Sequence, residues 1–313
     1  MDTDLVLQLG QAFSFKDWAR APAGQAGGII ARKAQASPAE WDRFAGETCA
    51  SFQADHAHLK AQALIGARQL RMFEFVDAAT GDKIGQCAVL KGGRRFEIQD
   101  GLQFRPDRQG QWQQAMRALL AELGAGTYVY GGLWSCEAPR DAEFAGLRGV
   151  TVEHVRPFAV QGVDFTKWPS WDRYWAKVSD SVRYESKYAP ERVPGLRLER
   201  FTGLAMLKTI PAIMELQGAS YARKAIGYNR WKQGLRYAYY MARCWRSLEV
   251  VLAVADAGVL AAYYGGRLGD RTYYIFGGQK AGSGGANWYL LKEMTRAAYE
   301  GSPEGRFIMG NVD

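Results

Sequence analysis

The pattern of apolar and polar positions predicts helices at the start of the first domain. Ser37-Pro38-Ala39-Glu40 combines a capping serine, a proline at the first helical position and a carboxylate in the first turn. A helix should therefore run from here through Phe44. A second helix is predicted from Asp55 to Ile65, where apolar residues recur on one side.

From Gln69 the apolar residues recur with a period of two, which indicates strands. Runs at 70–75, 84–90 and 96–99 are separated by glycine-containing turns at 80–82 and 91–93, and this predicts an antiparallel meander. A helix at 111–123 and a strand at 127–133 should follow. A last pair of strands, near 144–147 and 150–160, is expected to close the domain.

The second half of the chain repeats this order of elements. Ser170 should cap a helix that runs from Trp171 to about Tyr188 and bridges the two halves. Two helical segments are predicted next, at 205–216 and 220–245, and then three strands, at 247–256, 260–267 and 271–276. A glycine-rich loop, a helix at 288–299 and a strand at 306–309 should follow. We therefore predict an α+β fold of two tandem domains, with mixed, mostly antiparallel sheets flanked by helices.

The chain length agrees with this division, because 313 residues allow each domain a core of its own. The predicted parts are an N-terminal extension at 1–36, a first domain at 37–165, and a second domain at 166–313 that includes the bridging helix. A strand candidate within the extension, at 12–18, could complete the second sheet.

Composition and charge narrow the functional classes. The sequence has no basic leader and no apolar run long enough to cross a bilayer, so we expect a cytoplasmic protein. The four cysteines lie far apart without a CxxC pair, so neither a metal site nor a disulfide framework is indicated. The net charge of +8 favours a polyanionic partner such as RNA or the phosphates of CoA, and it also fits plain solubility.

The glycine-rich loop is the most informative chemical motif. Gln279-x-x-Gly282-x-Gly284, followed by Gly285, has the spacing of the acyl-CoA signature of GNAT enzymes. It lies between a predicted strand and a predicted helix, where glycines let the main chain approach phosphates and the helix N-terminus adds partial positive charge. These four residues are the candidate donor-binding residues, and an ordinary mobile loop is the alternative.

Several segments resemble the FemABX-type transferases of the GNAT superfamily. Ser37 to Phe44, and then Ser51-Phe52-Gln53 leading to Lys60, resemble the opening of that family. The segment from Ser179 to Lys187 is similar to its "S-x-x-x-R-x-x-x-(R/K)" motif, and 287–301 with 307–313 is similar to its final helix and "fD-x-G-G" strand. The resemblance covers residues 37 to 313, and each motif in it is loose.

This resemblance implies tandem GNAT-like domains and, in one branch, transfer of an amino acid from aminoacyl-tRNA to the amine of a peptide precursor. Sister branches use acyl-CoA. By position it implies that Lys60, Arg183, Lys187 and Tyr228 contact the acceptor or a phosphate, with Tyr237 as a second tyrosine candidate. Solvated basic residues and tyrosines at the edge of the core are the alternative interpretation. We expect the acceptor cleft between the domains.

The catalytic base is less well indicated. Family members continue past the "fD-x-G-G" strand to a Phe-Lys pair, whereas this sequence stops at Asp313, so a catalytic lysine cannot be assigned at the usual place. Asp100 is a candidate base, because aminolysis needs a deprotonated amine. An aspartate before a glycine more often shapes a turn.

Three functional classes therefore stay open. An aminoacyl-tRNA-dependent transferase that forms an amide is favoured by the tandem resemblance and the charge. An acyl-CoA-dependent N-acyltransferase is favoured by the glycine spacing. An RNA-binding or partner-binding module is the third, because aromatic and basic residues alternate over 221–246, although core packing explains these rings equally well. Neither enzyme needs a metal or a permanently bound cofactor, since the donor itself is activated.

Overall fold

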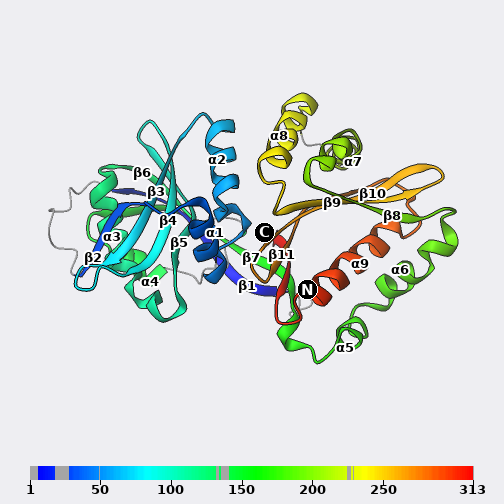
Figure 1. The fold of residues 1–313 in the computed structure, drawn as a ribbon, viewed down its shortest axis with the longest axis horizontal. Coiled ribbons are helices and arrows are strands. Elements are labelled where there is room, and N and C mark those ends of the chain that lie inside the picture. The colour runs from blue at the N-terminus through cyan, green and yellow to red at the C-terminus, as the bar shows by residue number, and fades with distance from the viewer. Residues whose placement is uncertain are drawn as a thin grey trace. The chain divides into compact units, whose positions relative to one another are not determined.

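The computed structural model describes residues 6–17, 28–48, 50–131, 134, 141–223, 227 and 229–312 (Figure 1). The chain divides into two compact units: unit 1 is Met1–Gln161 with Asn311–Asp313, and unit 2 is Gly162–Gly310. Both units combine helices with mixed sheet, which confirms the predicted α+β class.

Unit 1 follows the predicted order closely. Its strands and helices are β1 (Val6–Asp17), β2 (Ile29–Lys33), α1 (Pro38–Glu47), α2 (His56–Ile65), β3 (Gln69–Asp77), β4 (Lys83–Gly92), β5 (Arg95–Phe104), α3 (Trp112–Leu123), β6 (Gly126–Tyr130), α4 (Asp141–Ala145) and β7 (Val150–Asp164). Short 3-10 turns lie at Phe52–Ala54, Pro106–Gln111 and Phe165–Lys167.

Local capping chemistry fixes where the first helices begin. The hydroxyl of Ser37 accepts from the Glu40 N–H, while the Glu40 side chain accepts from the Ser37 N–H, so the predicted capping box is present. Asp55 caps α2 by accepting from the N–H groups of Ala57 and His58. The segment at 144–147, predicted as a strand, is instead part of α4 and the turn after it. Phe144 is buried there against Trp112 and Tyr130 at ring distances of 4.9 and 5.3 Å.

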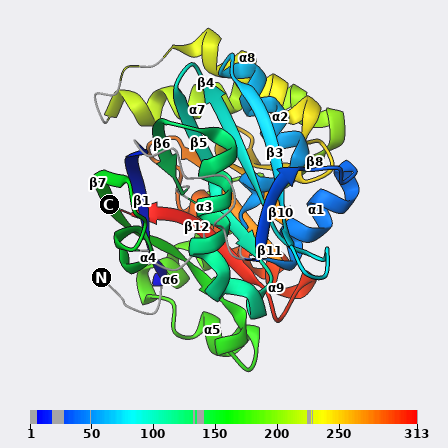
Figure 2. The same cartoon turned by 90° about the vertical axis from the view of Figure 1, so that its left-hand side faces the viewer.

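The sheet of unit 1 has apolar residues on both faces. Phe73, Phe75 and Val89 belong to a core cluster with α3, and α3 crosses in front of these strands in Figure 2. On the other face Ala88 packs with Trp41 of α1 and Leu59 of α2. Helices thus cover both sides of the meander.

Unit 2 consists of α5 (Trp171–Trp175), α6 (Asp180–Arg192), β8 (Arg197–Thr202), α7 (Ile210–Arg223), α8 (Arg230–Arg243), β9 (Leu248–Ala255), β10 (Gly258–Leu268), β11 (Arg271–Gln279), α9 (Ala286–Gly301) and β12 (Arg306–Val312), with a 3-10 turn at Gly203–Thr209. The single helix predicted from Trp171 to Tyr188 is wrong. The chain leaves the helix after Ala176, and Ser179 takes an extended conformation before α6 begins.

Helices also cover both faces of the sheet in unit 2. In Figure 1, α7 and α8 lie on one side of β8–β11 and α9 on the other, with α6 outside α9. Val251, Ala261 and Tyr263 pack against Leu290 and Met294 of α9. The layers hold β11 and the loop that follows it in place, because α7 packs on one side of this strand and α9 on the other.

The described strands follow one hydrogen-bonded order, β2-β3-β4-β5-β6-β1-β7-β12-β11-β10-β9-β8. We predicted two separate sheets, and this continuous order corrects that prediction. The strand predicted at 12–18 is part of β1, which pairs with β6 and β7 rather than completing a second sheet. Such long-range pairing provides hydrogen-bond partners for the main-chain groups at strand edges, but it leaves no periodic signal in the sequence.

No helix in the described part of the chain combines the length and the apolar composition that crossing a membrane requires.

Candidate functional site

Each unit contains two neighbouring parallel strands that stay paired for only a few residues. β5 and β6 pair from Arg95↔Thr127 to Ile98↔Tyr130, although β5 continues to Phe104. β11 and β12 pair from Arg271↔Arg306 to Tyr273↔Ile308, and β11 continues to Gln279. Within the described residues the second half of β11 therefore has main-chain groups that β12 does not bind.

A bulge follows the last parallel pair in both units. Asp100 and Gly101 have left-handed backbone angles and lie in the irregular register between β4 and β5. Ile275 is the extra residue between β10 and β11. Both bulges begin two residues after the last parallel pair, at Ile98 and at Tyr273, so the units repeat this local geometry despite their different sequences. A bulge turns main-chain groups out of the regular ladder, and this suits contact with a ligand.

The glycine loop joins the free half of β11 to α9. Gly282, Gly284 and Gly285 have φ angles of 71°, 60° and 88°, in the left-handed region that L side chains disfavour. Gly285 is the N-cap of α9, a helix of 16 residues with no side-chain cap and no acidic residue in its first turn. Its first N–H groups therefore form the positive end of a long helix, the setting in which proteins bind anions.

The three glycines differ in what lies beside them. A β-carbon at Gly284 would meet Val193 Cγ2 at 2.7 Å, and one at Gly285 would meet the Glu185 carbonyl oxygen at 2.6 Å. Close packing against Val193 and α6 therefore explains why Gly284 and Gly285 are glycines. A β-carbon at Gly282 would meet nothing within 4 Å. Gly282 is the residue of the three at which the loop opens to solvent.

Glu185 is a neighbour of this loop that the spacing analysis missed. Its carboxylate oxygen lies 3.0 Å from the position of a β-carbon on Gly285, close to the N-terminus of α9. Arg192 donates to the same carboxylate at 2.9 Å and stacks over the Tyr184 ring at 4.8 Å. The pair supplies one negative and one positive group beside the loop, and the only sequence signal for it is that Glu185 lies within the motif at 179–187.

Tyr237, the second tyrosine candidate, lies over the free half of β11. Its ring centroid is 6.3 Å from that of Phe276 on β11 and 5.6 Å from that of Tyr264 on β10. Its hydroxyl accepts from Gln217 Nε2 at 2.9 Å. On the other face of β11, burial raises the pKa of Tyr274 to about 12, so Tyr274 is neutral at physiological pH.

The remaining acceptor candidates belong to α6 of unit 2 and to α2 of unit 1. Arg183 is half-buried on α6, and its guanidinium pairs with Asp180 one turn before it. Lys187 is exposed one turn later, with its ammonium 5.0 Å from the centroid of the Tyr188 ring. Lys60 is exposed on α2 of unit 1. Tyr228 lies outside the described residues.

Asp100 is buried at the bulge of β5, where its carboxylate accepts from the Ser51 N–H. Ser51 in turn caps the turn at Phe52–Ala54 by accepting from the Gln53 N–H. The carboxylate thus binds the main chain at the start of the 3-10 turn Phe52–Ala54, a contact with another segment and not with the Asp100-Gly101 turn that the sequence suggested. Asp100 belongs to unit 1, and the glycine loop belongs to unit 2.

Burial differs between the two ends of α8, the helix within the stretch of aromatic and basic residues at 221–246. Tyr240 and Met241 are buried, and burial raises the pKa of Tyr240. Trp231 at the other end of α8 is 85% exposed, and Arg230 and Lys232 beside it are exposed as well. The core interpretation thus holds for the last turns of α8 and not for its first.

No protein-family model matches this chain. No curated protein matches it by sequence. Among solved structures, FemX matches with a TM-score of 0.65 and 13% identity over 90% of this chain and 89% of FemX. The chain has the FemX fold. A conserved protein of unknown function from Bacteroides thetaiotaomicron matches with a TM-score of 0.50 and 10% identity, over 90% of each chain.

A third match, L-PGS from Bacillus licheniformis, has a TM-score of 0.49 and 12% identity over 90% of this chain and 77% of that one. The FemX likeness confirms the FemABX-type fold that the loose motifs indicated. At 13% identity it is a likeness of fold, and the reaction does not follow from it.

Proposed function

We propose that this protein is a transferase that moves an activated acyl or aminoacyl group onto an amine, with the donor bound at β11 and the glycine loop of unit 2. One observation carries the proposal. β11 leaves its parallel partner after Tyr273 and leads directly into a loop of three left-handed glycines and the uncapped N-terminus of α9. An extended donor can pair with the free strand edge while its phosphates meet the loop.

In this proposal each group of the loop has a defined task. Gly282, which opens to solvent, lets a phosphate approach the main chain, and the N–H groups at the start of α9 stabilise the negative charge. Gln279, exposed at the end of β11, donates to the same ligand from its side-chain amide in this proposal. Gly284 and Gly285 allow the loop to pack closely on α6.

The chemistry is aminolysis of an ester or thioester. The nitrogen of the acceptor amine forms a bond to the donor carbonyl carbon, and the bond from that carbon to the ester oxygen or thioester sulfur breaks. The amine proton leaves with the departing oxygen or sulfur. Main-chain N–H groups at the bulge around Ile275 are suited to stabilise the oxyanion, because β12 does not engage this part of β11. Positioning supplies the rest of the rate enhancement.

The donor that we propose first is aminoacyl-tRNA, because its RNA would meet a chain of net charge +8 and because the motif resemblance points to that branch. Acyl-CoA is the second candidate, favoured by the Gln279-x-x-Gly282-x-Gly284 spacing at an observed strand-to-helix junction. For the acceptor we propose that Arg183 and Lys187, one turn apart on α6, meet an acidic or phosphorylated amine compound.

Two parallel incubations test the proposal. Candidate amines are mixed with the protein and either a charged tRNA pool or a set of acyl-CoAs, and amide products are identified by mass spectrometry. Product that disappears after ribonuclease treatment supports the aminoacyl-tRNA reaction. Ribonuclease-resistant product with release of CoA supports the second candidate. No amide from either donor pool would contradict the transferase proposal.

A further inference from the structure

A cavity of about 230 Å³ lies in unit 2 at the opposite end of β11 from the glycine loop. The ends of β8, β9 and β10 form its floor, and residues in the C-terminal half of α9 form its roof. Gly266, Ala297 and Ala298 leave the space open, because each has little or no side chain. None of the donor-site residues lines it.

The lining is unusually rich in arginine. Arg200, Arg246 and Arg267 line the cavity together with a single acidic residue, Glu249, which leaves the lining with a net charge of +2. Glu249 lies 3.6 Å from Arg200 and so balances one of the three cations. In the described part of the chain, no carboxylate pairs with Arg246 or Arg267.

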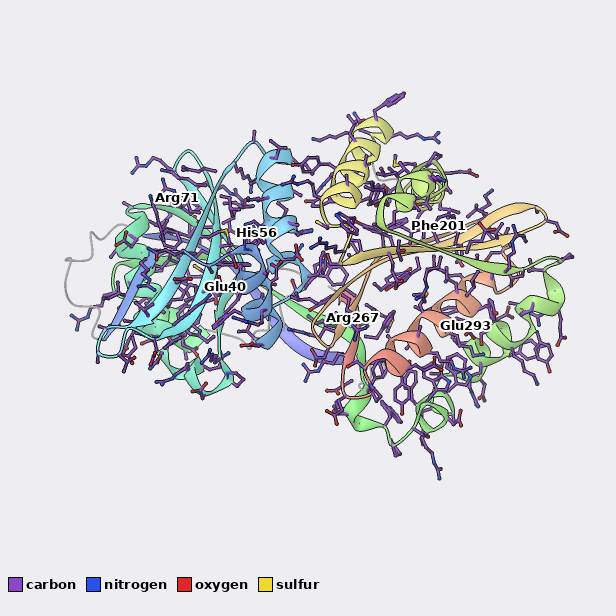
Figure 3. All side chains as sticks on the ribbon, viewed as in Figure 1. Glu40, His56, Arg71, Phe201, Arg267 and Glu293 are labelled. Carbon is purple, nitrogen blue, oxygen red and sulfur yellow. The ribbon has the colours of Figure 1, made fainter. Side chains whose placement is uncertain are left out.

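The two uncompensated guanidiniums are held in place by neutral partners. Arg267, labelled in Figure 3, donates to the carbonyl oxygens of Gly269 and Gly301, each at 3.2 Å. Arg246 stacks on the ring of Trp245 at 5.0 Å. Carbonyl groups and an indole ring orient a guanidinium without cancelling its charge, so both exposed cations stay available to an anion.

We infer that this cavity binds the phosphate group of a small molecule. A phosphate monoester carries close to two negative charges at neutral pH, which matches a lining of +2, whereas a carboxylate carries one. Guanidinium forks match the oxygens of phosphate, and the hydroxyls of Thr202 and Ser247 in the lining add two further donors. The volume is below that of pockets for drug-sized ligands, so it fits a phosphate with a small attached group.

Calorimetric titration of the full chain with inorganic phosphate, at constant ionic strength, tests this inference. We expect binding tighter than about 1 mM, with acetate binding at least tenfold more weakly. Arg246→Gln should weaken phosphate binding at least tenfold. The matched control is Arg243→Gln, which removes the same charge from an exposed residue of α8 outside the cavity and should change the affinity less than twofold.

A second variant should change the phosphate affinity in the opposite direction. Glu249→Gln removes the one carboxylate of the lining and frees Arg200, so phosphate should bind at least threefold more tightly. Equal affinity of Arg246→Gln and the wild type would place phosphate elsewhere, for example at the glycine loop, and would overturn the inference. Absence of binding to the wild type, or equally tight binding of acetate, would overturn it as well. None of these outcomes depends on the transferase activity.

Discussion

At the scale of single residues, the carboxylates of the first two helices show how burial alters chemistry. Asp42 on α1 accepts from the His56 N–H at 2.7 Å and lies close to Asp55. Burial, followed by the charge of Asp55, raises the pKa of Asp42 to about 6 from its usual 3.8. The folded chain thus holds a proton on Asp42 over a pH range in which the unfolded chain has lost it.

This shift predicts a pH-dependent gain of stability in Asp42→Asn. Between pH 4 and pH 6 the unfolded chain binds fewer protons at this residue than the folded chain does, so the contribution of Asp42 to stability falls as the pH rises. An asparagine avoids this loss and still accepts from the His56 N–H. We expect Asp42→Asn to be more stable than the wild type by about 1 kcal/mol at pH 7, and similar to it at pH 4.

Urea unfolding at the two pH values measures the difference. Asp82→Asn, in an exposed turn, serves as the control and should show no such change between the two pH values. A stability difference between Asp42→Asn and wild type that is the same at pH 4 and pH 7 would contradict the prediction.

Gly282 provides the second prediction at this scale. Gly282→Ala adds a methyl group in open space at a left-handed position, so it should cost about 1 kcal/mol of stability and hinder the approach of the donor. We expect the donor KM to rise at least fivefold. Gly258→Ala is the matched control, because Gly258 also has a left-handed φ and no atom within 4 Å, and it is the first residue of β10, after the turn from β9. Equal donor KM values in the two variants would argue against a donor at the loop.

At the scale of elements, the packing of α9 on α6 explains two of the loop glycines. A β-carbon at Gly285 would lie 2.6 Å from a main-chain oxygen of α6, and neither group can turn aside as a flexible side chain can. Gly285→Ala should therefore force α9 away from α6. We expect a loss of stability of about 2–4 kcal/mol, clearly larger than that of Gly282→Ala, measured by thermal unfolding. Similar losses in both variants would show that the close approach to α6 does not matter.

The cations of α6 give a prediction at the same scale. Arg183→Ala with Lys187→Ala should raise the KM of an acidic amine acceptor at least about tenfold, or roughly 1.4 kcal/mol, if both meet the same anionic group. As solvated residues they would change stability by only a few tenths of a kcal/mol. Lys208→Ala with Arg296→Ala is the control of equal charge, since both residues are exposed elsewhere in unit 2. An acceptor KM that is unchanged in the α6 variant would remove these residues from the site.

At the scale of the whole molecule, the net charge predicts how the donor reaction responds to salt. RNA binding releases counterions, so an aminoacyl-tRNA reaction that uses three phosphate contacts should lose about tenfold or more in kcat/KM between 50 and 200 mM salt. An acyl-CoA reaction should lose much less, because CoA is a small molecule and lacks the condensed counterion layer that RNA releases on binding. Steady-state rates measured over this range, with either donor, provide the check. A flat salt response of ribonuclease-sensitive product would contradict an electrostatic role for the chain.

Features that depend on local sequence could be predicted, and contacts between distant segments could not. The cap at Ser37, the helix that follows Asp55, the meander of β3 to β5 and the strand-loop-helix around Gly282 depend on neighbours in the chain, and local patterns predicted them. The sequence also placed the glycine loop between a strand and a helix. It could not show that Gly284 and Gly285 face α6, or that Glu185 lies beside them, because these contacts join residues about a hundred positions apart. Nor could the sequence show that Arg200, Arg246 and Arg267 line one cavity, because they belong to separate segments of the chain.

The position of β1 has a consequence for how the protein folds during synthesis. β1 ends at Asp17, but its partners β6 and β7 begin only at Gly126 and Val150. At a translation rate of about 5–20 residues per second, the ribosome needs on the order of ten seconds to deliver β7 after β1. Until β6 is made β1 has neither of its neighbours, and until β7 is made one of its strand edges stays open to other chains. A chaperone that binds extended segments should therefore hold nascent chains that end before Gly126 and release those that extend beyond β7.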